Sequence, residues 1–251
     1  MYFYFRDIME SMNDLKKETS VIIGLALIIS SVIFGAFYYK AQSVNNADTL
    51  SVTGSAKTRV TSDQAKIVVA VSRTVFASNL SSGYAEVAYD INLVRNLLKN
   101  SGVSDKDMVE SPVSMNQMYD QNSGAEIRYQ LIETVTIQSN DVTKITDISK
   151  KIPSLSSQGA MVSTQSLEYY YSKLPDLRVS LLEDAVKDAK SRAEKIAAGT
   201  GRRVGSVRAA SSGVVQVLSP NSVDISDYGN YDTSSVDKDV MVTVKASFDL
   251  K

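Results

Sequence analysis

The residue types that carry most enzyme chemistry are missing from this chain. Its 251 residues include no His and no Cys. Without His there is no imidazole base, no Ser-His-Asp triad and no histidine metal ligand. Without Cys there is no thiol nucleophile, disulfide or zinc–thiolate centre. Any chemistry would need carboxylates, Lys, Tyr or Ser, so we expect a non-enzymatic protein with no cofactor and no bound metal.

Carboxylates are the remaining candidates for a chemical site. Glu133 falls in register with Leu131 and Val135 on the apolar face of a predicted strand, where burial would raise its pKa. The competing interpretation is that Glu133 lies near a sheet edge or pairs with Lys or Arg. Several aspartates also surround Gly229, and carboxylate oxygens suit Ca²⁺. Their spacing matches no calcium loop, so a solvated surface loop is expected; they are Asp224, Asp227, Asp232, Asp237 and Asp239.

Tyrosines and arginines in the C-terminal part of the chain are the candidates for contact with a partner. Tyr228 and Tyr231 lie in a polar loop over residues 219–237, and Tyr beside small polar residues forms an adaptable contact surface. Arg202 and Arg203 belong to a stretch in which cations outnumber carboxylates. An anionic surface such as lipid headgroups is one partner for this stretch. The alternative is that these cations stabilise the C-terminal end of a helix.

An uncharged apolar run over residues 21–39 is the strongest positional signal in the chain. As a helix it would span roughly 28 Å, about the hydrocarbon thickness of a bilayer. The run is longer than the core of a cleaved signal peptide, and cleavage after Ala41 would leave Tyr39 where a small residue is preferred. We therefore favour a retained anchor over a cleaved signal. Tyr38, Tyr39 and Lys40 suit the membrane–water interface at the C-terminal end of the span.

The anchor divides the chain into a short N-terminal segment and one large domain. We expect residues 1–20 to be cytoplasmic, 40–48 to be a linker and 49–251 to fold outside the cytoplasmic membrane, in the periplasm or the extracellular space. The flanking charges support this orientation only weakly. The native start is expected at Met9 or Met12. The net charge is −1, so the basic surplus typical of nucleic-acid binding is absent.

The periodicity of apolar residues predicts an α+β domain with a mainly antiparallel sheet, two long helices and one short helix. Strands are expected over residues 49–57, 64–76, 108–119, 125–139, 160–172, 203–218 and 240–248, and helices over 78–100, 142–152 and 175–199. Pro112 interrupts the third strand, which is therefore expected at an edge or bulge. Residues 120–124 are expected to form a hairpin loop. The last strand follows a long excursion and is expected to pair with an early strand.

The apolar spacing of the two long helices predicts which of their faces are buried. The first stripe contains Leu80, Tyr84, Val87, Ile91, Val94 and Leu98. The second contains Leu177, Leu181, Ala185, Ala189, Ala193 and Ile196. The small alanines in the second stripe predict close approach to a neighbouring element.

Four local sequences, in this order, resemble the SIMPL family, also met as the YggE-like periplasmic or secreted family. Residues 50–56 resemble its I-x-V-x-G-x-G/A start, 100–108 its helix exit, 184–197 its alanine-rich helix and 201–205 its G-x-x-(L/V)-G turn. The resemblance covers residues 49–250. It implies an extracytoplasmic domain behind a signal or single span, and a loose association with envelope or oxidative-stress defence. The family has no agreed catalytic residues, so the resemblance supplies none.

The sequence therefore predicts a membrane-anchored extracytoplasmic protein, held by residues 21–39, that acts as a homo-oligomer or by binding an envelope component. The alternative is a module for a small ligand or glycan, with a pocket lined by residues 169–171 or by the 219–237 loop. A hydrolase is the third interpretation. It would need two carboxylates about 5–10 Å apart across a cleft, and the sequence shows no such pair.

Overall fold

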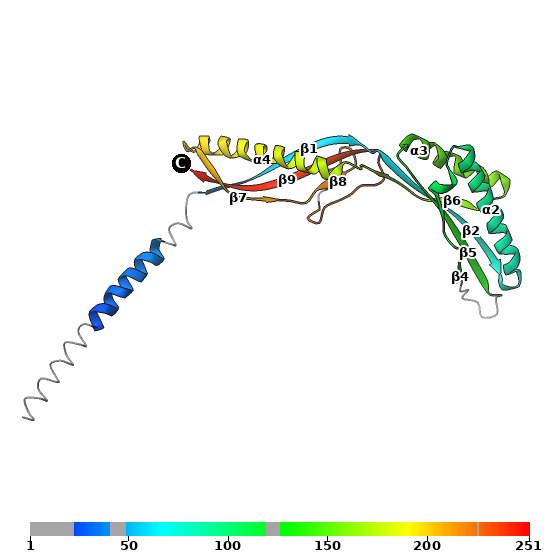
Figure 1. The fold of residues 1–251 in the computed structure, drawn as a ribbon, viewed down its shortest axis with the longest axis horizontal. Helices are drawn as coiled ribbons and strands as arrows, with labels where there is room; N and C mark the ends of the chain where they lie inside the picture. The colour runs from blue at the N-terminus through cyan, green and yellow to red at the C-terminus, as the bar shows by residue number, and fades with distance from the viewer. Residues whose placement is uncertain (1–22, 41–48, 119–125, 225) are drawn as a thin grey trace, which may run out of the picture. The chain divides into compact units, whose positions relative to one another are not determined.

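The chain folds into antiparallel β-sheets covered by helices, which is the α+β class that the sequence predicts (Figure 1). A computed structural model describes residues 23–40, 49–118, 126–224 and 226–251. The strands are divided over two sheets, whereas one mainly antiparallel sheet was expected. Three predicted segments lie outside the described residues: the N-terminal segment at 1–20, most of the linker at 40–48 and the whole hairpin loop at 120–124.

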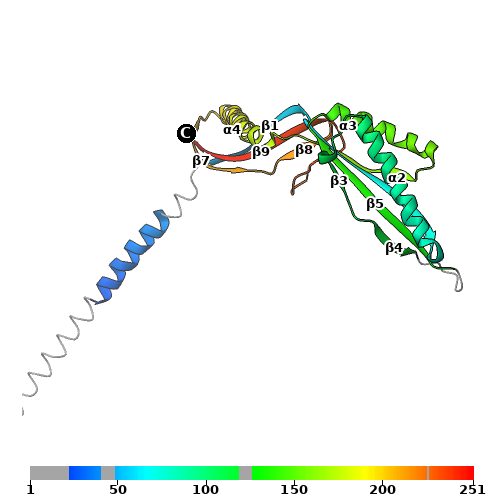
Figure 2. The same ribbon diagram turned by 45° about the vertical axis from the view of Figure 1, so that its right-hand side comes forward.

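The first sheet has five strands in the order β3-β5-β2-β6, with β4 also pairing with β5. Its strands are β2 (Gln64–Phe76), β3 (Met108–Glu110), β4 (Ser114–Met118), β5 (Arg128–Ser139) and β6 (Val162–Tyr170). Successive side chains of a strand point to opposite faces, and Ile67, Val69 and Val71 are completely buried on one of them. That face is covered by two helices, α2 and α3 (Figures 1 and 2).

Helix α2 (Leu80–Asn100) follows the 3₁₀ turn η1 (Ala77–Asn79) and confirms most of the predicted stripe. Val87, Ile91, Val94 and Leu98 are buried, but Tyr84 is 43% exposed. The reason is the close approach of the helix to the sheet at Gly83, where an added Cβ would lie 2.9 Å from the Val75 methyl groups. A tyrosine has no room on that side, so the ring points to solvent.

Helix α3 (Val142–Lys151) is capped by Asp141, whose carboxylate accepts a hydrogen bond from the backbone N–H of Lys144 at 2.9 Å. The 3₁₀ helix η3 (Ile152–Gln158) continues it. The short helix η2 (Asp105–Asp107) leads into β3. Strands β3 and β4 lie on the outer side of β5, separated at Pro112, which confirms the predicted edge.

The second sheet runs in the order β1-β9-β7, with β8 also pairing with β9. Its strands are β1 (Thr49–Thr61), β7 (Val204–Ser212), β8 (Gln216–Leu218) and β9 (Asp237–Leu250). The last strand therefore pairs with the first, as predicted. The predicted alternation is confirmed by the burial of Val240, Val242, Val244, Ala246 and Phe248.

Helix α4 (Leu174–Gly199) runs beside this sheet in both views (Figures 1 and 2). Ala185 and Ala189 are completely buried, and the close approach predicted from them is made at Gly54. The prediction for Ile196 is wrong, because this side chain is 50% exposed and Ala197 is buried instead. The buried positions of α4 repeat every fourth residue from Leu181, so the contact stripe reaches residue 197.

The contacts divide the chain into two compact units. The first contains residues 193–209 and 247–251 together with the described residues up to residue 51. The second contains residues 52–192 and 210–246.

Candidate functional site

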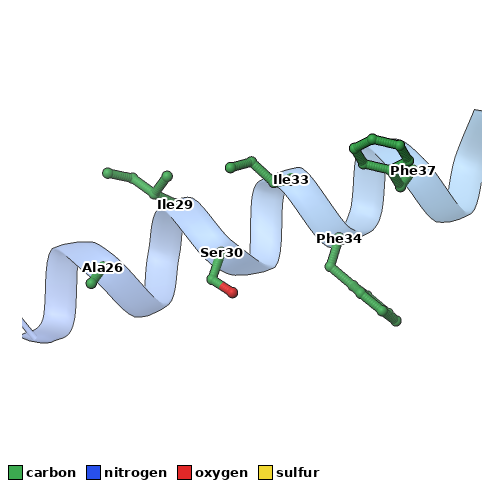
Figure 3. A pocket seen from close by; sticks show the side chains of 6 residues that line it. All are labelled: Ala26, Ile29, Ser30, Ile33, Phe34 and Phe37. Carbon is green, nitrogen blue, oxygen red and sulfur yellow. The ribbon is translucent and has the colours of Figure 1, made fainter.

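The N-terminal helix, Ile23–Lys40, is 18 residues long, and none of its apolar window is buried. Figure 3 shows Ile29, Ile33 and Phe37 on one side of the helix, with Ser30 and Phe34 pointing elsewhere. An uncharged apolar helix whose side chains are not buried by the described part of the chain suits a lipid environment. By length and composition it can cross a membrane, as an anchor or as a signal sequence.

The two candidate tyrosines of the 219–237 loop differ in accessibility. Tyr228 is 96% exposed. Tyr231 packs on Tyr170 with ring centroids 6.1 Å apart, and its hydroxyl accepts a hydrogen bond from the backbone N–H of Tyr171 at 3.4 Å. Partner contact remains a prediction for both tyrosines, and Tyr228 is the one whose whole ring is accessible.

The tyrosines at the end of β6 are engaged with neighbouring side chains. Tyr169 is buried, and its hydroxyl lies 3.0 Å from that of Thr146. Tyr170 donates to the carboxylate of Glu168, which Lys66 also reaches at 3.4 Å. The hydrogen bond to Glu168, followed by burial, raises the pKa of Tyr170 to about 12. Tyr169 therefore ties β6 to α3, and Tyr170 is not poised for proton transfer near neutral pH.

The 219–237 loop does form a shallow pocket, of about 240 Å³. Its polar lining consists of Ser219, Ser222, Asp224, Asn230, Tyr231 and Asp232. The loop is bent by two residues in the left-handed region, Asn221 with φ 65° and Gly229 with φ 85°. Asn and Gly are the residues that adopt this conformation at the lowest cost.

Three of the aspartates around this loop have side-chain partners, namely Asp232, Asp237 and Asp239. Burial opposes ionisation of Asp232, but the hydroxyls of Ser234 and Ser235 and the charge of Lys238 lower its pKa to about 2. Hydrogen bonds from Arg59 and Lys57 hold the pKa of Asp239 well below its usual range. Among the residues that the structure describes, no three His, Cys, Asp or Glu side chains gather as metal ligands.

Lys238 is a buried cation that the sequence analysis missed. Its Nζ donates to the backbone carbonyls of Asp232 at 2.5 Å and Ser235 at 2.7 Å, and lies 3.7 Å from the Asp232 carboxylate. Burial lowers its pKa, and Asp232 opposes that shift. The signal was present in the alternation of β9, which places residue 238 in register with Val240 and Val242.

Asp90 of α2 and Arg73 of β2 form an ion pair that the sequence pattern did not predict. Asp90 is completely buried, and Arg73 donates to its two carboxylate oxygens at 2.7 and 2.8 Å. The same guanidinium reaches the carbonyl of Gly159 at 2.7 Å, and the N–H of Met161 donates to Asp90 at 3.2 Å. This network ties β2, α2 and the start of β6 together. Asp90 is three residues after Val87, so a carboxylate beside the apolar stripe was the available signal.

Glu133 is half-buried, on the face of β5 that also carries Leu131 and Val135. Burial and then the charge of Glu110 raise the pKa of Glu133, while Arg95 opposes the shift. Arg95 itself holds Glu110 through two hydrogen bonds of 3.0 and 2.8 Å. The arrangement agrees with the expected carboxylate near a sheet edge and beside an arginine.

Replacing Glu133 by Gln is expected to stabilise the protein near neutral pH. Because its pKa is raised in the folded state, the ionised carboxylate lowers stability as pH rises through that pKa. The variant removes this cost, so its melting temperature is expected to rise by about 2 °C at pH 7. The difference should disappear below the ordinary pKa of a glutamate, at about pH 4. Melting curves of both proteins from pH 4 to pH 8 test this, and an equal difference at all pH values contradicts it.

The basic stretch over residues 187–208 is largely paired. Lys187 contacts Glu183 at 2.8 Å, Arg192 contacts Asp188 at 2.8 Å, and Arg208 pairs with Asp249. Arg202 and Arg203 follow the end of α4, at the turn that Gly201 makes with φ 73°. The N–H of Arg202 caps the helix by donating to the carbonyl of Ala197 at 2.9 Å. The side chain of Arg203 is exposed.

These elements define a two-sheet α+β domain that follows an apolar N-terminal helix. A scan against protein-family models matches SIMPL, described as a protein of unknown function (DUF541), over residues 50–248. The chain therefore belongs to the SIMPL family, as its local sequence motifs indicated. A search of curated proteins finds no match.

Likeness to solved structures is partial. One, a provisionally assigned amidohydrolase/peptidase from Burkholderia cenocepacia, is 11% identical with a TM-score of 0.26 over 51% of this chain and 32% of that protein. A provisionally assigned aminohydrolase from methicillin-resistant Staphylococcus aureus is 12% identical with a TM-score of 0.23, over 50% and 32%. AtUAH in complex with glyoxylate is 12% identical with a TM-score of 0.20, over 51% and 30%. The chain spans about a third of each protein, and these scores carry no argument on activity.

Proposed function

We propose that this protein is a non-enzymatic SIMPL-domain protein, anchored in the cytoplasmic membrane by its N-terminal helix, whose domain acts outside that membrane by self-assembly. The role in envelope or oxidative-stress defence that the family resemblance implies belongs to the same proposal. A membrane anchor supports assembly because it confines the copies to a surface and raises their effective concentration.

The observation that carries this proposal is the edge strand β4. It is exposed along its whole length and contains no charged residue. Met115 is 47% exposed and Met118 is 41% exposed. Edge strands present unpaired backbone groups, and proteins usually protect them with charges or by covering them. Strand β7, at an edge of the other sheet, is also largely exposed and carries Arg208 as its only charge.

An unprotected edge is suited to pairing with a strand from a second copy. Main-chain hydrogen bonds would satisfy the unpaired groups, and the exposed methionines would lose their contact with water. Because the same edge is present on every copy, two molecules can pair symmetrically around a two-fold axis. This mode of contact needs no catalytic residue and no cofactor.

The test is the protein mass of the full chain in detergent, measured by light scattering. We expect a defined oligomer for the unmodified chain. In Asn116→Lys, a like charge on both edges should raise the dissociation constant at least about tenfold. The control Ser81→Lys adds the same charge at an exposed position of α2 and should leave the mass unchanged. A monomeric unmodified chain, or an oligomer indifferent to Asn116→Lys, would contradict assembly through β4.

A second candidate function, a module for a small ligand or glycan, is favoured by the pocket in the 219–237 loop. Hydroxyl, amide and carboxylate groups line it, as a sugar would need. Its volume of about 240 Å³ is below the usual range for ligand sites, which begins at about 300 Å³. Its carboxylate at Asp232 is already held by Ser234 and Ser235. Self-assembly therefore remains the better-supported function.

The third interpretation, a carboxylate-dependent hydrolase, has the least support. The charge of Glu110 contributes to the raised pKa of Glu133, but Arg95 occupies both oxygens of Glu110. Neither carboxylate lines the 219–237 pocket. An acid and base pair would need both groups open to one substrate.

A further inference from the structure

We propose that the compact unit containing the end of α4 and the start of β7 docks on anionic lipid headgroups, using Lys195, Arg202 and Arg203. The inference rests on the proposed membrane anchor and adds a partner for the domain that the anchor holds. Its basis is the surplus of cations in this unit and the short chain that connects the unit to the apolar helix.

The cations of this unit outnumber its carboxylates. Within residues 49–51, 193–209 and 247–251 the cations are Lys195, Arg202, Arg203, Arg208 and Lys251, and the carboxylates are Glu194 and Asp249. Asp249 is committed to Arg208. The other three basic residues of the docking proposal lie at the end of α4 and in the turn that follows it, where Arg202 also donates to the carbonyl of Leu250 at 3.5 Å. Lys195 and Arg203 are exposed, and Arg202 is half-buried.

Backbone pairing holds these cations beside the point where the chain enters the domain. The N–H of Arg203 donates to the carbonyl of Lys251, and the N–H of Lys251 donates back, both at 2.8 Å. In the same unit the hydroxyls of Ser51 and Ser247 lie 2.5 Å apart. Strand β9 therefore joins the basic turn on one side to the first residues of β1 on the other (Figure 1).

The connection to the apolar helix is short. Eight residues separate Lys40, the last residue of that helix, from Thr49, the first residue of β1. Fully extended, such a segment reaches at most about 30 Å. The entry point of the domain therefore stays within about 30 Å of the end of the apolar helix, a range that includes contact with the membrane surface. Anionic lipid attracts cations within about a Debye length, roughly 10 Å at 0.1 M salt.

The unit also exposes apolar side chains among its cations. Ile196 and Val207 are each 50% exposed. Basic residues interspersed with apolar ones suit the boundary between headgroups and acyl chains. The competing interpretation is that Arg202 and Arg203 only stabilise the C-terminal end of α4. That interpretation predicts no dependence on lipid charge, so the two can be distinguished.

The test uses the full chain reconstituted into vesicles. Because the protein has no Cys, Val207→Cys introduces a single site for a fluorophore in this unit, and Val109→Cys provides a matched exposed site in the other unit. Quenching by headgroup-spin-labelled lipid is compared between phosphatidylcholine vesicles and vesicles containing about one third phosphatidylglycerol. Flotation after carbonate washing reports the anchor separately.

We expect quenching at position 207, but not at position 109, to increase in the anionic vesicles and to fall to the phosphatidylcholine level in 1 M salt. A cation near such a surface changes the docked-to-free ratio about fivefold, so the combined variant Lys195→Gln/Arg202→Gln/Arg203→Gln should lower it roughly a hundredfold. The control Lys99→Gln/Lys106→Gln/Lys151→Gln removes the same charge from the other unit and should have no effect. The melting temperature of each variant identifies any loss of folding. If the combined variant does not fold, the single variant Arg203→Gln, which changes only an exposed side chain, tests the same prediction.

Equal quenching in both lipids, or quenching indifferent to the basic variant, would overturn docking even with the anchor intact. A chain removed by carbonate would overturn the anchor instead. In that case the protein labelled at position 207 is mixed with anionic vesicles that contain the spin-labelled lipid. No increase in quenching on mixing would overturn docking as well.

Discussion

Arg73→Met is expected to lower the free energy of unfolding by about 3–5 kcal/mol, because it leaves the carboxylate of Asp90 buried without its charged partner. Asp90 is completely inaccessible, and the Arg73 side chain is 16% exposed. The guanidinium makes two bonds to the carboxylate and one to the carbonyl of Gly159. Urea unfolding of the full chain in detergent, followed by circular dichroism, measures the loss.

The double variant Arg73→Met/Asp90→Asn separates the unpaired charge from the lost packing. Asn keeps the shape of Asp and an oxygen that can accept from the N–H of Met161, but it carries no charge. We expect the double variant to be clearly more stable than Arg73→Met alone. If both variants lose the same free energy, the buried charge is not the cause and the network acts only through packing.

Gly54→Val is expected to destabilise the second sheet by about 3 kcal/mol, the upper end of the usual cost of overpacking. A Cβ at Gly54 would overlap the backbone oxygen of Ala185 and the backbone nitrogen of Ala189, and would lie 2.7 Å from the Ala189 Cβ. These are mainly backbone atoms, which cannot rotate away as the end of a long side chain can. Helix α4 would have to move off β1 and lose the burial of its alanine stripe.

The matched control is Gly199→Ala, at the last residue of α4. An added Cβ there meets no heavy atom within 4 Å. We expect its free energy of unfolding to be unchanged or to rise by up to about 1 kcal/mol, because Ala restricts the unfolded chain. Thermal and urea unfolding of both variants check this. A Gly54→Val protein as stable as the Gly199→Ala protein would show that α4 does not approach β1 as closely as the structure describes.

Both large effects occur at positions that the sequence pattern predicted only in part. The alanines of α4 predicted a close neighbour, but not that Gly54 would be that neighbour, more than 130 positions earlier in the chain. Asp90 lies beside a predicted apolar stripe, but nothing in the periodicity pointed to Arg73 as its partner. The predictions that Tyr84 and Ile196 would be buried were wrong for a related reason. A stripe gives the average direction of a buried face, while the local distance to the sheet decides which side chain fits.

The sequence by itself determined the apolar helix, the family, the α+β class and most elements, including β2, whose residues 64–76 match the prediction. Alternation and helical spacing are set by local geometry, so a single chain segment reveals them. Tertiary structure alone decided that the strands form two sheets, that Tyr231 packs on Tyr170 while Tyr228 stays exposed, and which charges neutralise one another. Those outcomes depend on strand register and on contacts between distant segments, and local periodicity does not encode either.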